Sequence, residues 1–483
     1  MEQIGVRGQE FFDEHGRVRI FHGVNVVCKE RAKGYFYELS TAEIDRLREY
    51  GFNVVRLGVI WDGLEPEPGV LDEEYLARLE EHARTLAEHG MYVVLDMHQD
   101  LYSARFSDGA PEWATLTDGL SGPGEAVVWS DAYMSEAVQR AFDHFWANDK
   151  APDGLGLQDH FAACWRAIAE RLGSQKWLLG YDLFNEPFPG SLASRIYNAF
   201  FTALSQTTGV ELGELLAALA SFEGRARVLR LIDDERLYKR LLEVIEPYVK
   251  KFELEYLVPF YGRVLEAIRS VAQRGVAFLE DCYFCNAGVP TSLTPVTRGG
   301  SRETLQAYAP HVYDLVVDTP YVATHFSPRR LSVIVEAKRR AQERIGTPVF
   351  VGEWGAFGRY EGIATHCKQL LDLFDDMAWS WAYWAWTPDF WSTETASLLA
   401  RPYPAAVSGR LLSYRYQDRR FEMRWVTEPS LQAPTLVRLP RSFNASEIRV
   451  EPKASVEIVE ESGAVFVEVR TQQAGRHVLT VEG

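Results

Sequence analysis

Short apolar runs alternate along the chain with longer stretches whose apolar residues recur at the period of a helix. Residues 51–61, GFNVVRLGVIW, have the length and branched side chains of a buried strand, whereas residues 72–89 show the spacing of an amphipathic helix. Such strands are predicted at 18–27, 51–61, 91–100, 177–187, 276–282, 308–313, 348–355 and 379–386. Because continuous apolar strands that alternate with helices form parallel sheets, these eight units predict a (β/α)8 barrel of the TIM type.

The pattern changes at about residue 404. From there to residue 483, apolar and polar residues alternate with a period of two, as in FEMRWV and AVFVEVR, and Pro, Gly, Asn and Ser separate the runs. This alternation is typical of antiparallel strands that bury one face. We therefore predict two domains, an α/β barrel over residues 1–403 and a C-terminal antiparallel β-sandwich over residues 404–483.

One segment interrupts the alternation of strands and helices. Residues 191–256 directly follow the fourth predicted strand and form a long, charged stretch with helical periodicity. Insertions that follow barrel strands rise over the mouth of the barrel, where the active sites of this fold lie. The pattern alone fits two interpretations equally, a lid over the mouth or a passive helical decoration.

The composition narrows the classes of partner. The 483 residues include 51 basic and 68 acidic side chains, which gives a net charge of −17. This balance disfavours binding to nucleic acids and tight docking on anionic lipid. Aromatic residues make up 13% of the chain, which suits stacking on sugars, although a large barrel core also uses many of them.

Cysteine usage and the N-terminal residues bear on the compartment. The five cysteines do not resemble a disulfide framework, and the single C-x-x-C pair, Cys282 and Cys285, lacks the second pair of a zinc site, so we expect buried free thiols. The first residues lack a basic segment followed by an apolar one, and no apolar run is long enough to span a membrane. We expect a cytoplasmic protein, or a secreted one if a signal peptide has been removed.

Polar residues cluster where the predicted barrel strands end. They are Arg56 in the second strand, His98, Gln99 and Asp100 after the third, Asn185 and Glu186 after the fourth, His311 and Tyr313 after the sixth, Glu353 and Trp354 after the seventh, and Trp384 and Trp386 after the eighth. Barrel enzymes build their active sites at this end of the strands. Two glutamates there suit glycoside hydrolysis, in which one carboxylic acid protonates the leaving oxygen and one carboxylate attacks the anomeric carbon.

Each of the other polar groups has a role in this hypothesis and a simpler alternative. Asn185 can bind a sugar 2-hydroxyl, Arg56 and His311 can orient an ionised Glu353, and Tyr313 can donate to it. Taken alone, Arg56 suits a buried ion pair. The alternatives for the remaining residues are a core histidine at His98, structural acceptors at Asp96 and Asp182, rival carboxylates at Glu280 and Asp281, and core or rim rings at Trp379, Trp381 and Trp386.

Two motifs carry a resemblance to a known family. YDLFNEPF, residues 181–188, and VFVGEWG, residues 349–355, resemble the acid/base and nucleophile motifs of glycoside hydrolase family 5. LDMHQDLYS, GAPEWATLTDG and RPYPAAVSG further resemble endoglycoceramidases, from about residue 17 onward. The resemblance implies Glu186 as acid/base and Glu353 as nucleophile. It implies that Asn185, Arg56, His98, His311 and Tyr313 support them, and that Lys29, Asp100, Trp129 and Trp384 contact the first sugar.

The same resemblance implies a retaining hydrolase that cleaves the β-glycosidic bond between a glycan and ceramide in glycosphingolipids, with no metal or organic cofactor and no required protein partner. Transient contact with a membrane or micelle surface would accompany such a substrate. Apolar residues expected near the mouth, Phe188, Phe357, Phe390 and Trp391, fit a lipid aglycone.

Three alternatives to this function remain open. An enlarged loop at 191–256 could close the glycan side, which would give an exo-acting glucosylceramidase or β-glucosidase. A β-glucan or mannan endo-glycanase would share the fold. From a different class, a non-catalytic glycolipid-binding protein would need no paired carboxylates.

Overall fold

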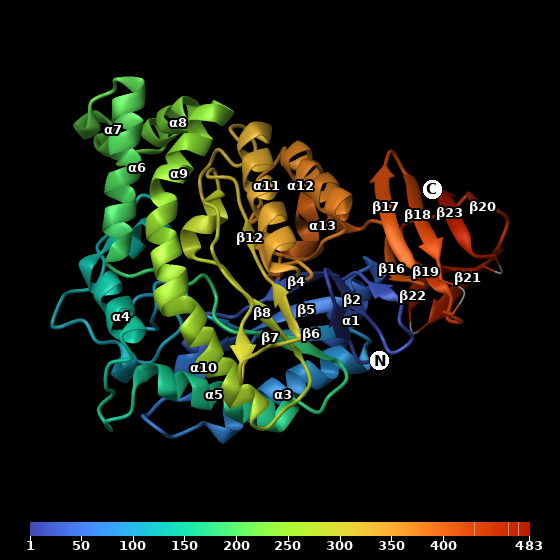
Figure 1. Ribbon diagram of the computed structural model, residues 1–483, viewed down its shortest axis with the longest axis horizontal. Coiled ribbons are helices and arrows are strands. Elements are labelled where there is room, and N and C mark those ends of the chain that lie inside the picture. Colours follow the sequence, from blue (N-terminus) through green and yellow to red (C-terminus); the bar gives the residue numbers. More distant parts are fainter. Residues whose placement is uncertain (429, 462, 472) are drawn as a thin grey trace.

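The computed structural model describes residues 1–428, 430–461, 463–471 and 473–483 as a helix-covered barrel beside an all-β unit (Figure 1). The barrel strands are β4 (His22–Val26), β5 (Val54–Ile60), β6 (Tyr92–His98), β7 (Leu178–Asp182), β8 (Val276–Leu279), β11 (Gln306–Tyr308), β13 (Phe350–Val351) and β15 (Ser380–Tyr383). They pair in parallel in the order β11-β8-β7-β6-β5-β4-β15-β13. Each of the eight predicted strands overlaps one of these strands, so the predicted barrel is confirmed although the strand bounds differ.

The sheet closes between its two outer strands. Tyr308 bridges Val349 in parallel, and further along β12 (His311–Val312) pairs in parallel with β14 (Glu353–Trp354). This closure brings His311 directly opposite Glu353. The fold is therefore a TIM-like barrel, as the alternation of strands and helices predicts.

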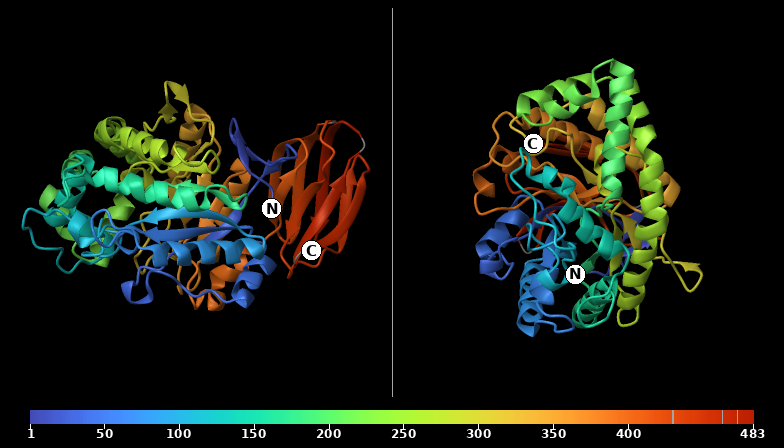
Figure 2. Two further views of the ribbon diagram at one scale, coloured as in Figure 1. Left: turned by 90° about the horizontal axis from the view of Figure 1, so that it is seen from below. Right: turned by 90° about the vertical axis from the view of Figure 1, so that its left-hand side faces the viewer.

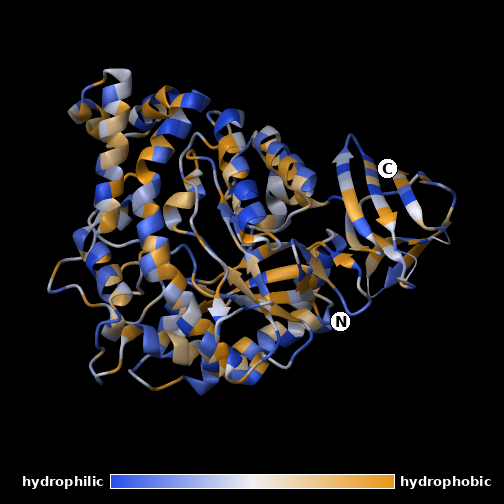
Figure 3. Ribbon diagram, in the orientation of Figure 1, coloured by the Kyte–Doolittle hydropathy of each residue, from blue (hydrophilic) through white to orange (hydrophobic). Residues whose placement is uncertain are grey.

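Helices cover the outside of the barrel. They are α1 (Thr41–Glu49), α2 (Trp61–Leu64), α3 (Glu73–Glu88), α4 (Glu136–Trp146), α5 (Leu157–Leu172), α10 (Val258–Arg269), α11 (Pro328–Ile345), α12 (Ala364–Met377) and α13 (Glu394–Leu399). Short helical turns lie between them: η1 (Arg31–Lys33), η2 (Glu112–Ala114), η3 (Trp129–Met134), η5 (Tyr283–Ala287) and η6 (Phe390–Ser392). In α3, Asp72 caps the first turn by accepting from the N–H groups of Glu74 and Tyr75, and the predicted apolar face is buried against the sheet. Orange residues accordingly concentrate on the central strands, whereas the surrounding helices carry both orange and blue residues (Figure 3).

The predicted insertion consists of four helices that stand beside the barrel: α6 (Leu192–Thr208), α7 (Leu212–Ala218), α8 (Phe222–Leu231) and α9 (Glu235–Phe252). A single π-helical turn, η4 (Glu253–Leu257), joins α9 to α10 of the barrel. Helices α6 and α9 lie side by side, and α7 and α8 lie at their far end (Figures 1 and 2). The insertion is therefore continuous with the helical layer of the barrel.

The all-β unit has two antiparallel sheets. One has the order β1-β2-β3-β16-β19-β22-β21, and the other has the order β17-β18-β23-β20. Their strands are β1 (Gly5–Arg7), β2 (Glu10–Phe12), β3 (Val18–Arg19), β16 (Tyr403–Val407), β17 (Arg410–Gln417), β18 (Arg420–Thr427), β19 (Thr435–Leu439), β20 (Glu447–Glu451), β21 (Ser455–Glu461), β22 (Ala464–Arg470) and β23 (Gly475–Glu482). A small hairpin, β9 (Thr297–Arg298) with β10 (Ser301–Arg302), lies in the barrel part.

A shared core joins the two sheets of this unit. Val437 and Val467 from the larger sheet pack in one cluster with Phe421, Trp425 and Leu479 from the smaller one. Because the N-terminal strand β3 pairs with β16, residues 5–19 belong to the same sheet as the C-terminal strands. The predicted antiparallel domain is present, while its boundary at residue 404 stays a prediction.

The cysteines and the helices agree with two expectations from the sequence. The cysteines are buried free thiols, as predicted: Cys28, Cys164, Cys282, Cys285 and Cys367. Within the described ranges, none of the helices combines the length and the apolar character that crossing a bilayer would require.

Barrel packing predicts that Gly180→Ala destabilises the protein. A Cβ at Gly180 of β7 would lie 1.9 Å from the Val276 carbonyl oxygen of β8, so the two strands would have to move apart. We expect a loss of about 1–3 kcal/mol in the free energy of unfolding, measured by urea denaturation. The control is Gly262→Ala in α10, where a Cβ would meet nothing within 4 Å and the helix should gain up to about 1 kcal/mol. Equal stability of the two variants would contradict this account.

Candidate active site

The two glutamates meet at the barrel mouth. Glu186 follows β7 in a turn with a left-handed backbone (φ +46°), and its N–H donates to Glu280 Oε2 at 2.7 Å. Glu353 opens β14, in register with His311 of β12. One ligand atom from each of Glu186, His311 and Glu353 lies within 4.8 Å of the others. This upper limit is nearer to the separation of about 5–5.5 Å in retaining glycosidases than to the roughly 6.5–9.5 Å by which inverting ones make room for a water molecule.

Arg56 of β5 lies at the floor of this mouth and is fully buried. Its guanidinium lies 2.8–3.0 Å from side-chain oxygens of Asn25, Asp96, Asp182, Asn185, Glu280 and Glu353. Burial opposes its charge, but the carboxylates of Asp96 and Asp182 outweigh burial and raise the pKa of Arg56 well above its usual value. The guanidinium therefore stays charged and holds the strand ends together.

Glu353 accepts two hydrogen bonds from opposite sides. Arg56 donates to Oε1 at 2.9 Å, and the Tyr313 hydroxyl donates to Oε2 at 2.9 Å. Burial raises the pKa of Glu353 to about 7, and the nearby Glu186 acts in the same direction, while His311 and Arg56 act against it. The two hydrogen bonds thus stabilise the ionised form of Glu353, whereas burial makes that form costly.

Glu186 has a different set of partners. His311 Nδ1 and Asn286 Nδ2 lie 2.9 and 2.6 Å from Glu186 Oε1, and His311 Nδ1 also lies 3.6 Å from Glu353 Oε2. Burial opposes a charge on His311, but Glu280 and Glu353 outweigh it and raise the pKa of His311 well above its usual value. The imidazolium thus lies between the two carboxylates and orients both.

A second polar group lies beside the glutamates. The Lys29 ammonium contacts Asp100, lies 3.9 Å from Asp108, and lies 4.8 Å from the centre of the Trp384 ring. His98 stacks on Trp384 with ring centres 5.1 Å apart and faces Asp96 through Nδ1 at 2.8 Å. Burial first, and Lys29 second, lower the pKa of His98 well below its usual value, so the imidazole is neutral.

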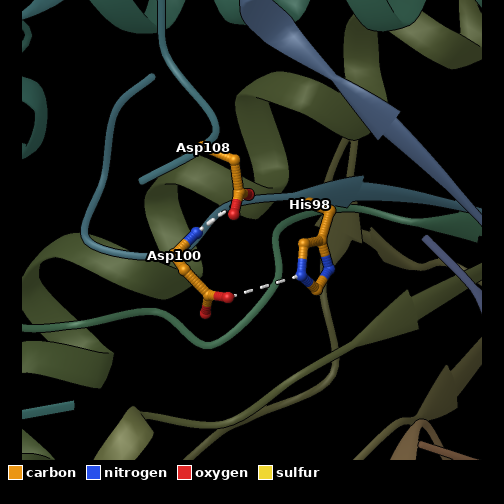
Figure 4. A group of neighbouring side chains, drawn as sticks. All are labelled: His98, Asp100 and Asp108. Atoms are coloured by element: carbon orange, nitrogen blue, oxygen red, sulfur yellow. Dashed lines mark hydrogen bonds and ion pairs between the residues drawn. The ribbon is translucent and has the colours of Figure 1, made fainter. Parts of the chain in front are cut away.

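His98, Asp100 and Asp108 also have the donor atoms and the spacing that a metal ion needs (Figure 4). In this group the Lys29 ammonium already contacts one carboxylate and lies near the other. A protein cation therefore balances the negative charge there, as Arg56 does for the group of Asp96, Asp182 and Glu280.

A cavity of about 390 Å³ contains these groups. Its polar end is formed by Lys29, His98, Asp100, Glu186, Tyr313, Glu353 and Trp384, together with Trp129 of η3, whose Nε1 donates to Asp318 Oδ2 at 2.7 Å. Its apolar wall comes from the insertion, through Tyr197, Phe200 and Phe201 of α6, Val228 and Leu229 of α8, and Ile232. The insertion therefore encloses the site rather than decorating a remote face.

The sequence-predicted site residues fall into two layers. Eight of them line the cavity: Lys29, His98, Asp100, Trp129, Glu186, Tyr313, Glu353 and Trp384. Arg56, Asn185 and His311 are buried behind that lining. In particular, the Asn185 amide accepts from Arg56 and donates to the Gln99 carbonyl at 3.1 Å, so it bonds to protein groups on both sides.

Sequence reasoning missed Asn25 and Asn286, and it named Glu280 only as a rival carboxylate. Asn25 is a single amide within an apolar strand, a signal that could have been used, because a buried amide needs partners. Asn286 lies in η5, several residues beyond the end of β8, so a search for polar residues directly after the strands does not find it. Glu280 accepts from both Arg56 and the Glu186 N–H, so it fixes the backbone at Glu186.

The prediction that Phe188, Phe357 and Phe390 offer an apolar surface to a lipid aglycone is wrong, because none of them lines the cavity. Their side chains are 1%, 0% and 1% exposed and belong to the core. Phe188, for example, stacks on Tyr133 with ring centres 4.7 Å apart. Trp391 packs beside Tyr50, again outside the cavity lining. Packing against neighbouring aromatic rings buries these side chains more completely than a position in the cavity wall would.

Comparisons with known proteins agree with this architecture. The family described as Cellulase (glycosyl hydrolase family 5) matches residues 18–208 and 246–390, and the glycoside hydrolase family 5 C-terminal domain matches residues 401–482. The unmatched residues 209–245 fall within the insertion.

Relatives and solved structures give the same result. An endoglycoceramidase of Cyanea nozakii is 25% identical over 93% of this chain and 86% of its own length. A glucosylceramidase of Cryptococcus neoformans var. grubii is 26% identical over 45% of this chain and 37% of its own. The structure of endo-glycoceramidase II from a Rhodococcus species in complex with ganglioside GM3 is 25% identical, with a TM-score of 0.76 over 99% of this chain and 100% of that one. The chain therefore belongs to glycosyl hydrolase family 5.

Proposed function

We propose that the protein is a retaining β-glycosidase that hydrolyses the bond between a glycan, or a single glucose, and ceramide. The observation that carries this proposal is one cavity in which the close pair Glu186 and Glu353 meets the apolar wall of α6 and α8. An amphiphilic glycoside needs a polar slot for its sugar beside an apolar surface for its lipid. The likeness to endoglycoceramidases and glucosylceramidases supports the same substrate class.

In the proposed first step, Glu186 donates a proton to the glycosidic oxygen while Glu353 attacks the anomeric carbon. The bond to the aglycone breaks, ceramide leaves with the proton, and the sugar is held as an ester of Glu353. Arg56 and Tyr313 keep the attacking carboxylate oriented through their two hydrogen bonds.

In the second step a water molecule enters, Glu186 takes its proton, and the resulting hydroxide attacks the same carbon from the face that the aglycone left. The ester breaks, Glu353 is free again, and the anomeric configuration is retained. His311 and Asn286 hold Glu186 in place for both steps.

The polar end of the cavity would hold the first sugar. Trp384 offers an apolar ring face, and Lys29 and Asp100 offer a donor and an acceptor. With Nδ1 of the neutral His98 donating to Asp96, the buried Nε2 is left as an acceptor for a sugar hydroxyl.

A second candidate is an exo-acting glucosylceramidase. The hydrogen bond from Trp129 to Asp318 links η3 to the turn after β12, and both residues line the cavity, so this link would limit the length of the glycan. A β-glucan or mannan endo-glycanase would instead need an open cleft with aromatic rings on both sides of the glutamates.

Product analysis separates these substrates. We expect mass spectrometry to detect ceramide from glucosylceramide, lactosylceramide or ganglioside GM3 presented in detergent. Release of an intact oligosaccharide would establish endo action, and glucose from glucosylceramide alone would establish exo action. Activity on simple β-glucosides or glucans without any released ceramide would overturn the lipid substrate.

Removing either carboxylate should abolish turnover without abolishing binding. We expect Glu353→Gln and Glu186→Gln to lower kcat by at least about 10³-fold, because each removes a group that makes or breaks a bond. The matched control is Glu361→Gln, an exposed glutamate after the same strand, which should keep full activity. Isothermal titration with the glycan measures binding. Turnover by Glu353→Gln at the wild-type rate would contradict the mechanism and would favour a non-catalytic glycolipid-binding protein.

The pKa of about 7 at Glu353 predicts a pH-dependent stability. Since this folded-state pKa lies above the usual value of 4.5, the contribution of Glu353 to stability is greatest below pH 4.5 and is lost as the pH rises through 7. The amide introduced by Glu353→Gln would imitate the protonated carboxyl at every pH. Glu353→Gln should therefore be more stable than wild type at pH 8, by up to about 3 kcal/mol, and equal to it near pH 4.5. Thermal unfolding at both pH values tests this, and a pH-independent difference would contradict it.

A further inference from the structure

Two cavities on the insertion side share one wall. The inner one holds the glutamates, and an outer groove of about 610 Å³ lies between the segment 123–135 and helices α6 and α7. Four residues line both: Asp131 of η3, Tyr197 of α6, Leu219 after α7 and Arg225 of α8. This quartet, here called the partition, separates the inner cavity from the outer groove.

An ion pair and a hydrogen bond hold the partition together. Arg225 forms an ion pair with Asp131, and the two side chains are 19% and 32% exposed. The Nε of Arg225 separately donates to the Leu219 carbonyl at 2.9 Å, so Arg225 keeps its place on α8 when the ion pair opens. Because both side chains reach solvent, separating them leaves neither charge buried without a partner.

The inner cavity extends from Glu186 to the partition. Asn286 of η5 bonds Glu186, and Phe284 of the same turn packs edge-on against Tyr197, with ring centres 5.8 Å apart. In the proposed reaction the aglycone leaves from the oxygen next to Glu186, so its hydrocarbon part starts at this point of the cavity.

The outer groove continues the apolar surface into solvent. Val127 and Leu216 line it and are 38% and 43% exposed, and Pro123, Ala126, Met134 and Leu219 line it as well. Exposed apolar side chains grouped around a groove mark a binding surface. Because the partition borders both cavities, the occupant of the outer groove and the occupant of the inner cavity can be one molecule.

We propose that the outer groove binds the distal part of the aglycone hydrocarbon chain, which passes from Glu186 through the partition when Asp131 and Arg225 separate. Leu219 and the ion pair then set the length and bulk of the aglycone that the enzyme accepts. This inference rests on the proposed glycosidase activity toward lipid glycosides and adds the route and the residues that select the chain.

The test uses methyl, octyl and dodecyl β-lactosides and the same series of β-glucosides, below their micelle concentrations. For each protein the readout is the ratio of kcat/KM for the dodecyl substrate to that for the methyl substrate. Leu219→Trp narrows the partition, so we expect this ratio to fall at least tenfold. Arg225→Gln removes the ion pair, so we expect it to rise severalfold. The control is Arg227→Gln, an exposed arginine on the same helix, which should keep the wild-type ratio.

Each ratio is taken within one protein, so a partly folded variant lowers both of its terms and leaves the ratio informative. Unchanged ratios in both variants, with glycosphingolipids still cleaved, would overturn the route and leave the proposed function standing. Changed ratios without cleavage of any glycosphingolipid would support the route and overturn ceramide as the aglycone. A wild type that hydrolyses neither an alkyl glycoside nor a glycosphingolipid would overturn both the route and the proposed function.

Discussion

The buried guanidinium of Arg56 is the interaction on which the site depends. Burying a charge costs several kcal/mol unless neighbouring groups replace its water. Here oxygens from residues on or after strands around the barrel replace it, from Asn25 on β4 to Glu353 on β14. A guanidinium presents five N–H donors in one plane, which a lysine ammonium cannot do. One side chain therefore fixes the strand ends relative to one another. The positions of the two glutamates depend on this arrangement.

Much of the barrel and of its polar floor could be predicted from the sequence because both follow local rules. Apolar runs mark the strands, and the residues that follow them, such as Glu186 and Glu353, lie at one end of a parallel sheet whatever the loops do. The roles assigned to these residues stay predictions. Asn286 could not be found in this way, because it meets Glu186 only through the fold of a loop 100 residues later in the sequence.

Contacts between residues far apart in the sequence also explain why the aromatic residues expected to contact a lipid were wrongly chosen. Phe188, Phe357 and Phe390 follow barrel strands or lie near them, so sequence position placed them near the mouth. Their burial depends instead on packing partners such as Phe142 of α4 for Phe188 and Tyr383 of β15 for Phe390, and the apolar wall comes from α6 and α8. Helical periodicity showed that the insertion exists, but not which of its faces meets the cavity. The barrel thus supplies charge and hydrogen bonds, and the insertion supplies apolar surface.

The pairing of β3 with β16 has a consequence for how the protein is made. Arg19 of β3 donates to the Ala405 carbonyl, a partner 386 residues later in the sequence. The first barrel strand, β4, likewise pairs with β15 near the end of the barrel. During synthesis the N-terminal strands leave the ribosome long before their partners exist, and their unpaired edges are open to other chains. These edges can close only after residues beyond 400 have been synthesised, so the two ends of the chain complete the fold together.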